Sequence, residues 1–272
     1  MTTKLAPAPS TLAPVGVFDS GIGGLSILRE ITHLLPRERF VYFADLAYSP
    51  YGNKTAELVA ERCQRICDFL VAHPTKALVA ACNSATAVSI AGLRQNFTVP
   101  IIGVEPGIKP AIGKTLSGVV GIMATEMTVS SPRFKALVGQ FSDEVQIIIQ
   151  PCPGLADAIE LGDTGRSLRE ELLRRYMEPL LAGGVDTLVL GCTHYPLVID
   201  EIAAVADDRA QLIDTSEAIA RQVVARLELN GLLNADEGGG GVTFYSSREL
   251  PRLNKVFSYY WPGEFRVGLY SD

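Results

Sequence analysis

Two short segments decide the fold: AACNSA at residues 80–85 and LGCTHY at residues 190–195. Each follows a short apolar run, at 77–79 and 187–189, and each leads into a stretch with helical periodicity. We therefore interpret each segment as the carboxyl end of a buried strand that opens into a helix. In open α/β sheets, ligands bind at the carboxyl ends of the strands. The two segments thus predict one α/β lobe each and a shared cleft.

Each segment places a cysteine, Cys82 or Cys192, directly before small polar residues. The partial positive charge at a helix N-terminus lowers the pKa of a nearby thiol from about 8.5 into the reactive range. We expect this effect at both cysteines. Either cysteine alone could equally be a small hydrophobic residue at a strand end. Because the pattern occurs twice in parallel settings, it favours two reactive thiols that face each other.

The rest of the chain repeats a unit of short apolar strand, turn and amphipathic helix, which is typical of mainly parallel, doubly wound α/β sheets flanked by helices. The short strands are apolar on both faces, as buried parallel strands are. The predicted strands lie at 15–18, 40–43, 77–81, 100–104, 118–123, 145–149, 186–190, 211–213 and 242–245. The predicted helices lie at 25–35, 55–72, 84–95, 131–140, 168–181, 196–206 and 216–229, with a last helix led by Pro251.

The predicted domain organisation is two similar lobes with the active site in the cleft between them. Residues 1–14 are rich in Pro, Ala and Thr and are predicted to be a flexible extension. The stretch 104–114 holds two prolines and two glycines and is the candidate crossing between the lobes. We assign residues 15–108 together with 215–272 to the first lobe and residues 109–214 to the second.

Composition excludes several classes of protein. The 272 residues are 47% hydrophobic and 20% charged, which is an ordinary globular composition. A net charge of −6 and no basic stripe argue against nucleic-acid binding. No apolar run reaches the length of about 20 residues that spans a bilayer, and the N-terminal stretch lacks the apolar core of a secretory signal. Because both a membrane span and a signal are missing from the pattern, we expect a cytoplasmic protein without a membrane partner. An odd number of cysteines in such a chain disfavours a disulfide framework.

The cysteines and histidines outside the two segments offer no metal site. Cys63 and Cys67 lie four residues apart on one face of a predicted helix, which favours packing in the core. Cys152 stands between two prolines without polar neighbours and is predicted to be structural. Of the three histidines, only His194 lies in a candidate site. We therefore predict that the protein binds no metal.

Two further loops follow predicted strands. The loop DSGIGG begins at Asp19 and Ser20, and its glycines would let backbone N–H groups approach an anion. It matches neither GxGxxG nor a P-loop, so nucleotide binding is not predicted. Asp19 and Ser20 could also simply cap the next helix. In the loop after the second strand, Tyr51 and Gly52 are candidates, although a Pro/Gly turn explains most of that loop.

Two thiols across a cleft suit proton transfer at a carbon stereocentre. One thiolate removes the Cα proton from one face, and the opposite thiol delivers a proton to the other face. Helix N-termini and backbone donors can stabilise the carbanion between these steps. Nucleophilic acyl transfer by Cys192 and His194 is an alternative. It fits less well, because adjacent side chains on one turn need not converge and Cys82 would have no role.

Four motifs, FDSGIGGLS, ADLAYSPYGNK, AACNSA and VLGCTHYPL, resemble those of the glutamate racemases, a cofactor-independent family. They occur in the family's order from residue 17 to about 217. Aspartate racemases share the two-cysteine plan but not this full set. The resemblance implies two α/β lobes with the active site between them. It also implies conversion of L-glutamate into D-glutamate for bacterial peptidoglycan, without a cofactor.

The resemblance also implies roles for individual residues. Cys82 and Cys192 match the family's two acid/base cysteines, with Cys192 acting on L-glutamate and Cys82 on D-glutamate. Asp19, His194 and Glu160 match residues that assist the thiols. The positions that match substrate contacts are Asp19, Ser20, Tyr51, Gly52, Asn83, Ser84, Thr193 and His194.

The chain departs from the family pattern at two places. Ser84 stands where the family commonly has Thr, which keeps the hydroxyl. The segment MATEMT at 123–128 replaces a Gly-containing turn, and we expect it to affect loop shape more than chemistry. The extension at 1–14 resembles that of members activated by a peptidoglycan precursor, a UDP-linked muramoyl-alanine. Such activation is a further expectation, and a homodimer is one expected assembly.

Two alternatives stay open. One is another two-cysteine racemase or isomerase of the same plan that acts on aspartate or a hydantoin. The other is a two-lobe amino-acid binder of the periplasmic type, without catalysis. The paired thiols and the lack of a secretory signal argue against the binder, and the combination of LGCTHYPL with PYG argues against the other racemases.

Overall fold

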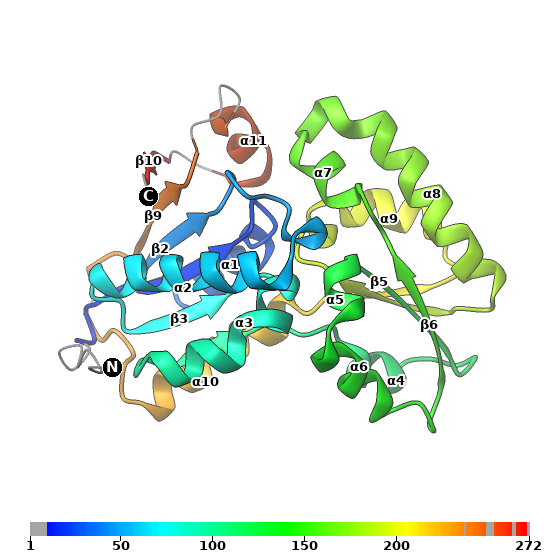
Figure 1. The fold of residues 1–272 in the computed structure, drawn as a ribbon, viewed down its shortest axis with the longest axis horizontal. Coiled ribbons are helices and arrows are strands. Elements are labelled where there is room, and N and C mark those ends of the chain that lie inside the picture. The colour runs from blue at the N-terminus through cyan, green and yellow to red at the C-terminus, as the bar shows by residue number, and fades with distance from the viewer. Residues whose placement is uncertain (1–9, 237, 249–252, 263–264, 271–272) are drawn as a thin grey trace.

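The computed structural model describes residues 10–236, 238–248, 253–262 and 265–270, and Figure 1 shows them as two lobes side by side. The first nine residues of the predicted extension and Pro251 lie outside the described residues. One lobe is built on a six-stranded sheet and the other on a four-stranded sheet. Neighbouring strands run parallel throughout both sheets. The predicted α/β class with two mainly parallel sheets is therefore confirmed.

We call the six-stranded sheet and the helices around it the first lobe. Its strands are β1 (Val15–Asp19), β2 (Arg39–Ala44), β3 (Ala77–Ala80), β4 (Ile101–Gly103), β9 (Gly241–Ser246) and β10 (Val267–Leu269). Its helices are α1 (Leu25–Leu34), the 3₁₀ turn η1 (Tyr51–Asn53), α2 (Ala56–Ala72), α3 (Asn83–Asn96), α10 (Ser216–Leu229) and α11 (Leu253–Tyr260). The strand order is β10–β9–β2–β1–β3–β4, so the C-terminal part of the chain pairs with β2.

We call the four-stranded sheet and its helices the second lobe. Its strands are β5 (Val119–Ala124), β6 (Gln146–Pro151), β7 (Thr187–Gly191) and β8 (Gln211–Ile213), in the order β6–β5–β7–β8. Its α-helices are α4 (Ile108–Ile112), α5 (Glu126–Ser130), α6 (Pro132–Gly139), α7 (Leu155–Glu160), α8 (Arg166–Ala182) and α9 (Ile199–Ala206). Its 3₁₀ turns are η2 (Gly162–Gly165) and η3 (Tyr195–Val198).

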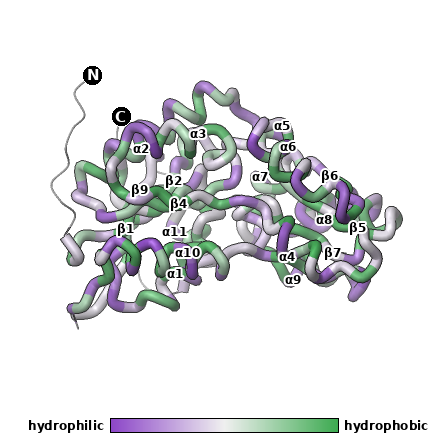
Figure 2. Tube along the Cα trace, turned by 90° about the horizontal axis from the view of Figure 1, so that it is seen from below, coloured by the Kyte–Doolittle hydropathy of each residue, from purple (hydrophilic) through white to green (hydrophobic). Residues whose placement is uncertain are grey.

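The first sheet is buried on both faces because a layer of helices covers each face. Successive side chains along a strand point alternately into these two layers. Val15 and Val17 of β1 pack in one core cluster with residues of α1 and α10. Phe18, the next residue, packs in a second cluster with residues of α2 and α3. Figure 2 shows the hydrophobic colour concentrated along these central strands, with hydrophilic stretches on α2 outside. This arrangement explains the apolar character of the strands on both faces.

The structure differs from the sequence-based elements at short segments. The predicted strands and longer helices are present within a few residues of the expected bounds. The expected helix at 196–206 begins instead as the 3₁₀ turn η3, and regular α-helix starts only at Ile199. Strand β10 and the short helices α4, α5 and α7 were not predicted, because three to six residues carry too little periodicity. Within the described residues, no helix is long and apolar enough to cross a membrane.

Parallel strands bring three loops to the interface between the lobes. In the first sheet β1 lies between β2 and β3, so the loops after β1 and β3 leave adjacent strand ends. In the second sheet β7 pairs with β5, with Gly191 opposite Ala124 at the strand ends. The arrows of β2 and β3 in Figure 1 point toward the second lobe. The carboxyl ends of both sheets thus supply the residues described next.

Candidate active site

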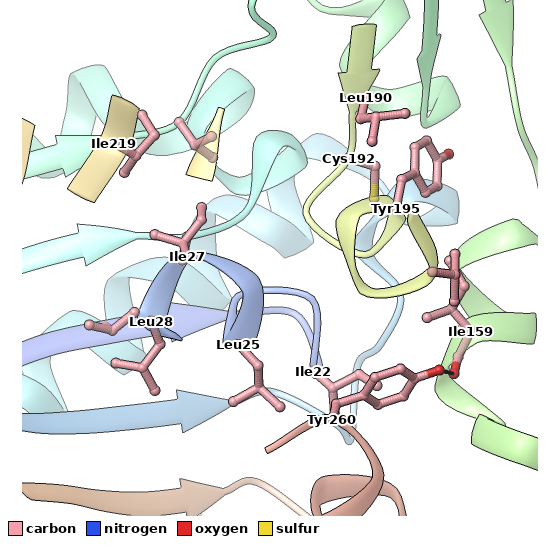
Figure 3. Close-up of a cluster of buried hydrophobic side chains, with 14 of the residues drawn as sticks. Ile22, Leu25, Ile27, Leu28, Ile159, Leu190, Cys192, Tyr195, Ile219 and Tyr260 are labelled. Atoms are coloured by element: carbon pink, nitrogen blue, oxygen red, sulfur yellow. Dashed lines mark hydrogen bonds between the residues drawn. The ribbon is translucent and has the colours of Figure 1, made fainter. Parts of the chain in front are cut away.

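Three strand ends supply the central side chains of the site. Asp19 closes β1, Cys82 follows β3, and Cys192 follows β7. Figure 3 shows Cys192 on the turn after β7. All three residues are buried. The Cys82 thiol contacts Ser20, and the neighbouring Asp19 accepts a hydrogen bond from Thr193, the residue after Cys192, so the two cysteine loops meet at the interface between the lobes.

The Cys82 thiol is held by the first turn of a helix. Cys82 is the N-cap of α3, and its sulfur accepts a hydrogen bond from the backbone N–H of Ala85 at 3.5 Å. The thiol also lies 3.8 Å from the Ser20 hydroxyl. The expected lowering of its pKa is wrong: burial, followed by the charge of Asp19, raises the pKa of Cys82 well above its usual range. Desolvation outweighs the favourable N–H contact.

The Cys192 thiol is held by side chains instead. His194 Nδ1 lies 3.8 Å from Cys192 Sγ, and His194 Nε2 lies 2.9 Å from Glu160 Oε1. Cys192 and His194 thus converge, although their place on one turn did not require it. Burial opposes the positive charge of His194, but hydrogen bonds with Cys192 and Glu160 outweigh it and raise the pKa of His194 well above its usual range. The structure thus places a chargeable imidazole beside this sulfur.

Asp19 links the lobes rather than capping α1. Its Oδ2 accepts a hydrogen bond from the Thr193 hydroxyl at 3.1 Å, and its Oδ1 accepts one from the Gly21 N–H at 2.7 Å. The N-cap of α1 is Gly24, and no side chain caps that helix. Burial raises the pKa of Asp19 above its ordinary value. The simple capping interpretation is therefore wrong.

The glycines of the DSGIGG loop leave room for the second lobe. A Cβ atom on Gly21 would stand 1.7 Å from Glu160 Oε1. A Cβ on Gly23 would stand 2.4 Å from His194 Nδ1 and 2.7 Å from Thr193 Oγ1. We expected these glycines to let backbone amides approach an anion. In the structure, they leave space for the Glu160, Thr193 and His194 side chains of the other lobe, and of these His194 contacts the Cys192 thiol.

Asn83 and Ser84 lie on the first turn of α3, and both are buried. Ser84 Oγ lies 2.9 Å from Thr125 Oγ1, at the end of β5 in the second lobe. Within the described residues, the Asn83 side-chain nitrogen finds no hydrogen-bond acceptor although it is buried. An unpaired buried donor is costly, so it points to an acceptor from a bound molecule. Because Thr125 contacts Ser84, the segment 123–128 contributes a side chain to the site, whereas we expected it to affect mainly the shape of the loop.

Tyr51 and Gly52 lie on η1, at the edge of this interface. The Tyr51 hydroxyl donates to Asp45 Oδ2 at 2.5 Å, and the tyrosine is buried. Its side chain is therefore already committed within the first lobe. A Cβ on Gly52 would stand 2.9 Å from Thr125. A cavity of about 230 Å³ lies here, between η1 and the starts of α5 and α7.

Sequence reasoning missed three residues of the site. Ser49 Oγ donates to Glu160 Oε1 at 2.7 Å, and Tyr42 donates from its hydroxyl to the Gly21 carbonyl at 2.9 Å. Thr125, already described, is the third. Thr125 could have been found because it follows a strand, as the other site residues do. Ser49 lies in the loop after β2, which was singled out, but the sequence does not show that its partner is Glu160 of the other lobe.

Of the other cysteines, two lie on α2, and Cys152 lines the cavity beside Gly52 and Thr125. Cys63 and Cys67 are buried on α2, as expected for packing residues. Cys152 donates from its thiol to the Gln150 carbonyl at 3.3 Å, and burial raises its pKa to about 12. In the part of the chain that the structure describes, no three His, Cys, Asp or Glu side chains gather in a way that could hold a metal.

This chain is similar to known racemases over nearly its whole length. The family model described as Asp/Glu/Hydantoin racemase matches residues 16–223. The glutamate racemase of Methylococcus capsulatus is 46% identical over 254 residues, which make up 93% of this chain and 94% of that protein.

Solved structures agree. Glutamate racemase isoform RacE1 from Bacillus anthracis has a TM-score of 0.86 at 30% identity, with 95% of this chain and 97% of that one covered. Escherichia coli glutamate racemase, in complex with L-glutamate and the activator UDP-MurNAc-Ala, has a TM-score of 0.81 at 32% identity, with 94% and 98% covered. The chain belongs to the Asp/Glu/Hydantoin racemase family and is an isomerase of that family.

Proposed function

We propose that this protein interconverts L-glutamate and D-glutamate by proton transfer between two thiols and Cα. One observation carries the proposal: Cys82 and Cys192 follow strands of different lobes, are buried, and lie on loops that meet at the interface, where Cys82 contacts Ser20 and the neighbouring Asp19 accepts a hydrogen bond from Thr193. Two acid/base groups on opposite sides of a bound Cα are what inversion of that centre requires.

The reaction conserves protons. Starting from L-glutamate, the Cys192 thiolate takes the Cα proton and becomes a thiol. Cys82 then gives its S–H proton to the opposite face of the carbanion and becomes a thiolate. The raised pKa of Cys82 suits this step, because burial keeps its proton in place until the carbanion needs it. The reverse reaction exchanges the two roles.

The neighbouring residues have auxiliary roles in the proposal. His194 lies between the Cys192 sulfur and the Glu160 carboxylate and can hold a positive charge beside the thiolate. Asp19 fixes Thr193 across the interface. The unpaired amide of Asn83 is a donor for a substrate carboxylate. Ser20, Ser84, Gly52 and Tyr51 complete the surroundings, with Tyr51 acting through the shape of its loop.

The relatives support the proposed substrate and activator. Relatives similar over nearly the whole chain are named glutamate racemases, and one was solved with L-glutamate and UDP-MurNAc-Ala. We propose glutamate as the substrate, peptidoglycan synthesis as the use of D-glutamate, and the same precursor as an activator. Five free cysteines suit a reducing compartment, so we propose a cytoplasmic enzyme. A homodimer is the proposed assembly.

The catalytic unit is proposed to consist of two domains. Residues 15–108 with 215–272 would form one domain and residues 109–214 the other. Two observations support these bounds. Strands β9 and β10 belong to the first sheet, and α10 packs with α1 in the same core cluster.

Deuterium exchange tests the proposed reaction. The purified protein is incubated with L-glutamate in D₂O, and deuterium at Cα is followed by NMR together with optical rotation. We expect exchange with loss of rotation. Exchange with L-aspartate or a hydantoin but not with glutamate would mean that the protein is a racemase of the same family with a different substrate. Binding of glutamate without exchange would contradict the proposed reaction.

A further inference from the structure

Ser49 joins the two lobes at the carboxylate that supports His194. It lies on the loop between β2 and η1 of the first lobe, and its hydroxyl donates to Glu160 Oε1 at 2.7 Å. Glu160 is the last residue of α7 in the second lobe. The same oxygen, Oε1, lies 2.9 Å from His194 Nε2. One carboxylate oxygen therefore has a partner in each lobe.

These contacts form one continuous chain of polar groups from Ser49 through Glu160 and His194 to Cys192. A carboxylate only accepts hydrogen bonds, so the Ser49 hydroxyl and His194 Nε2–H both donate to it. With Nε2 protonated toward Glu160, His194 Nδ1 is the atom that faces the Cys192 sulfur, at 3.8 Å. The orientation of Glu160 thus selects which imidazole nitrogen faces the thiol.

Glu160 needs an external partner to keep that orientation. Its side chain is 19% exposed, and α7 has only six residues. Among the described residues, its carboxylate contacts Ser49 and His194 and no lysine or arginine. Without Ser49, rotation of the carboxylate away from Gly21 would release His194.

We infer that Ser49 is a positioning residue that orients Glu160, and through it His194 beside Cys192, when the two lobes are in contact. This inference rests on the proposed two-thiol reaction for its effect on rate, but its geometric part does not. Because Ser49 belongs to the first lobe and Glu160 to the second, separation of the lobes would break the chain at its first bond. Closure on the substrate would thereby complete the set of groups around Cys192.

A second bond between the lobes provides a matched control. Tyr260, the last residue of α11, donates from its hydroxyl to the backbone carbonyl of Ile159 at 2.9 Å, as Figure 3 shows. Ile159 precedes Glu160 on α7. Tyr260→Phe removes a bond between the lobes at the same helix but leaves the Glu160 carboxylate and its two partners untouched. Comparison of Tyr260→Phe with Ser49→Ala therefore distinguishes weaker contact between the lobes from a change in the orientation of Glu160.

The experiment compares Ser49→Ala, Ser49→Thr and Tyr260→Phe with the unchanged protein. The first readout is NMR of ¹⁵N-histidine protein, which is practical because the chain has three histidines. In Ser49→Ala, we expect the His194 ring nitrogens to shift while His33 and His73 stay unchanged. Ser49→Thr keeps the hydroxyl and should restore the His194 signals. Tyr260→Phe should leave them in place.

The second readout is racemisation of glutamate. A hydrogen bond to a charged group is worth about a tenfold change in rate, so kcat of Ser49→Ala should fall about tenfold with KM nearly unchanged. Ser49→Thr should recover most of that loss. If Ser49 only held the lobes together, Ser49→Ala would instead raise KM in the same way as Tyr260→Phe.

Two results would overturn the inference. One is a His194 spectrum that Ser49→Ala leaves unchanged. The other is a loss of kcat that Ser49→Thr does not recover. If the unchanged protein fails to racemise glutamate, the proposed function fails, but the histidine spectra still decide whether Ser49 orients Glu160 and His194.

Discussion

The two thiol regions differ in what surrounds the sulfur. Cys82 sits at the start of α3, where a backbone N–H, the Ser20 hydroxyl and burial determine its state. Cys192 precedes a 3₁₀ turn and faces His194, which in turn contacts Glu160. The Cys82 region combines a main-chain donor with the charge of Asp19, whereas the Cys192 region contains a histidine paired with a carboxylate. The same side-chain type therefore stands in two different surroundings, one in each lobe.

The largest effect should come from removing either sulfur. Cys82→Ala and Cys192→Ala should each lower racemisation about a thousandfold or more, because each face of Cα then lacks its acid/base group. Polarimetry from both enantiomers measures the loss. Near-normal turnover in both directions by either variant would rule out two opposed thiols.

Replacement of His194, which has no counterpart beside Cys82, should cause a smaller loss of racemisation. His194→Asn keeps a polar side chain but removes the chargeable ring beside the sulfur. We expect kcat to fall about ten- to a hundredfold, since general acid–base assistance is reduced while both thiols remain. Initial rates with L- and D-glutamate measure it. A loss as large as that of Cys192→Ala would make His194 an acid/base group in its own right.

Gly21→Ala should disturb the Cys192 region from the opposite lobe. The new Cβ would occupy the place of Glu160 Oε1, which must swing away from His194 and Ser49. We expect about a tenfold loss in kcat, the effect of one charged hydrogen bond, with little change in Tm.

Gly92→Ala is the matched control for this substitution. Gly92 lies inside α3 with nothing within 4 Å of its Cβ position. It should keep full activity and gain about 0.5–1 kcal/mol of stability, because alanine is the better helix former. Equal kinetics for both glycine variants would contradict the proposed clearance role of Gly21.

The smallest expected effects are on the pH dependence of the stability. The Cys82 region and the Cys192 region should act in different pH ranges. The pKa of His194 is raised in the folded protein above its value of about 6.5 in the unfolded chain. Protonated His194 therefore contributes fully to the free energy of unfolding below about pH 6.5. This contribution is lost as the pH rises through the raised pKa. The raised pKa of Cys82 gives a corresponding loss that begins only near pH 9.

Chemical denaturation across pH measures both windows. His194→Asn should flatten the dependence above pH 6.5, and Cys82→Ala should flatten it only above about pH 9. A Cys82→Ala variant whose stability curve changes near neutral pH would show that the two regions are not independent.

Much of this site was predictable because of a rule about parallel sheets. Asp19 ends a strand, Cys82 and Cys192 each follow one, and the carboxyl ends of parallel strands meet at one edge. Glu160 lies on a short helix after β6, so its contact with His194 could be expected only from the family resemblance.

Other features could not be predicted because they depend on how the lobes dock. A Cβ atom added to Gly21 would lie 1.7 Å from Glu160 Oε1, which belongs to the other lobe. The hydrogen bond from Ser49 to Glu160 also connects the two lobes. The pKa of Cys82 was expected in the wrong direction because the sequence shows the helix but not the depth of burial. Strand β10, with three residues, was missed for lack of periodicity.

The most direct test of two opposed thiols is the fate of the α-proton in the first turnover. Unlabelled L-glutamate is supplied in D₂O, and the small amount of early D-glutamate is separated and examined for deuterium at Cα. Proton removal by one thiol and delivery by the other predict that this D-glutamate carries solvent deuterium while the remaining L-glutamate stays largely unlabelled. Early D-glutamate that retains the substrate's own proton would mean that one group serves both faces, and would contradict the account.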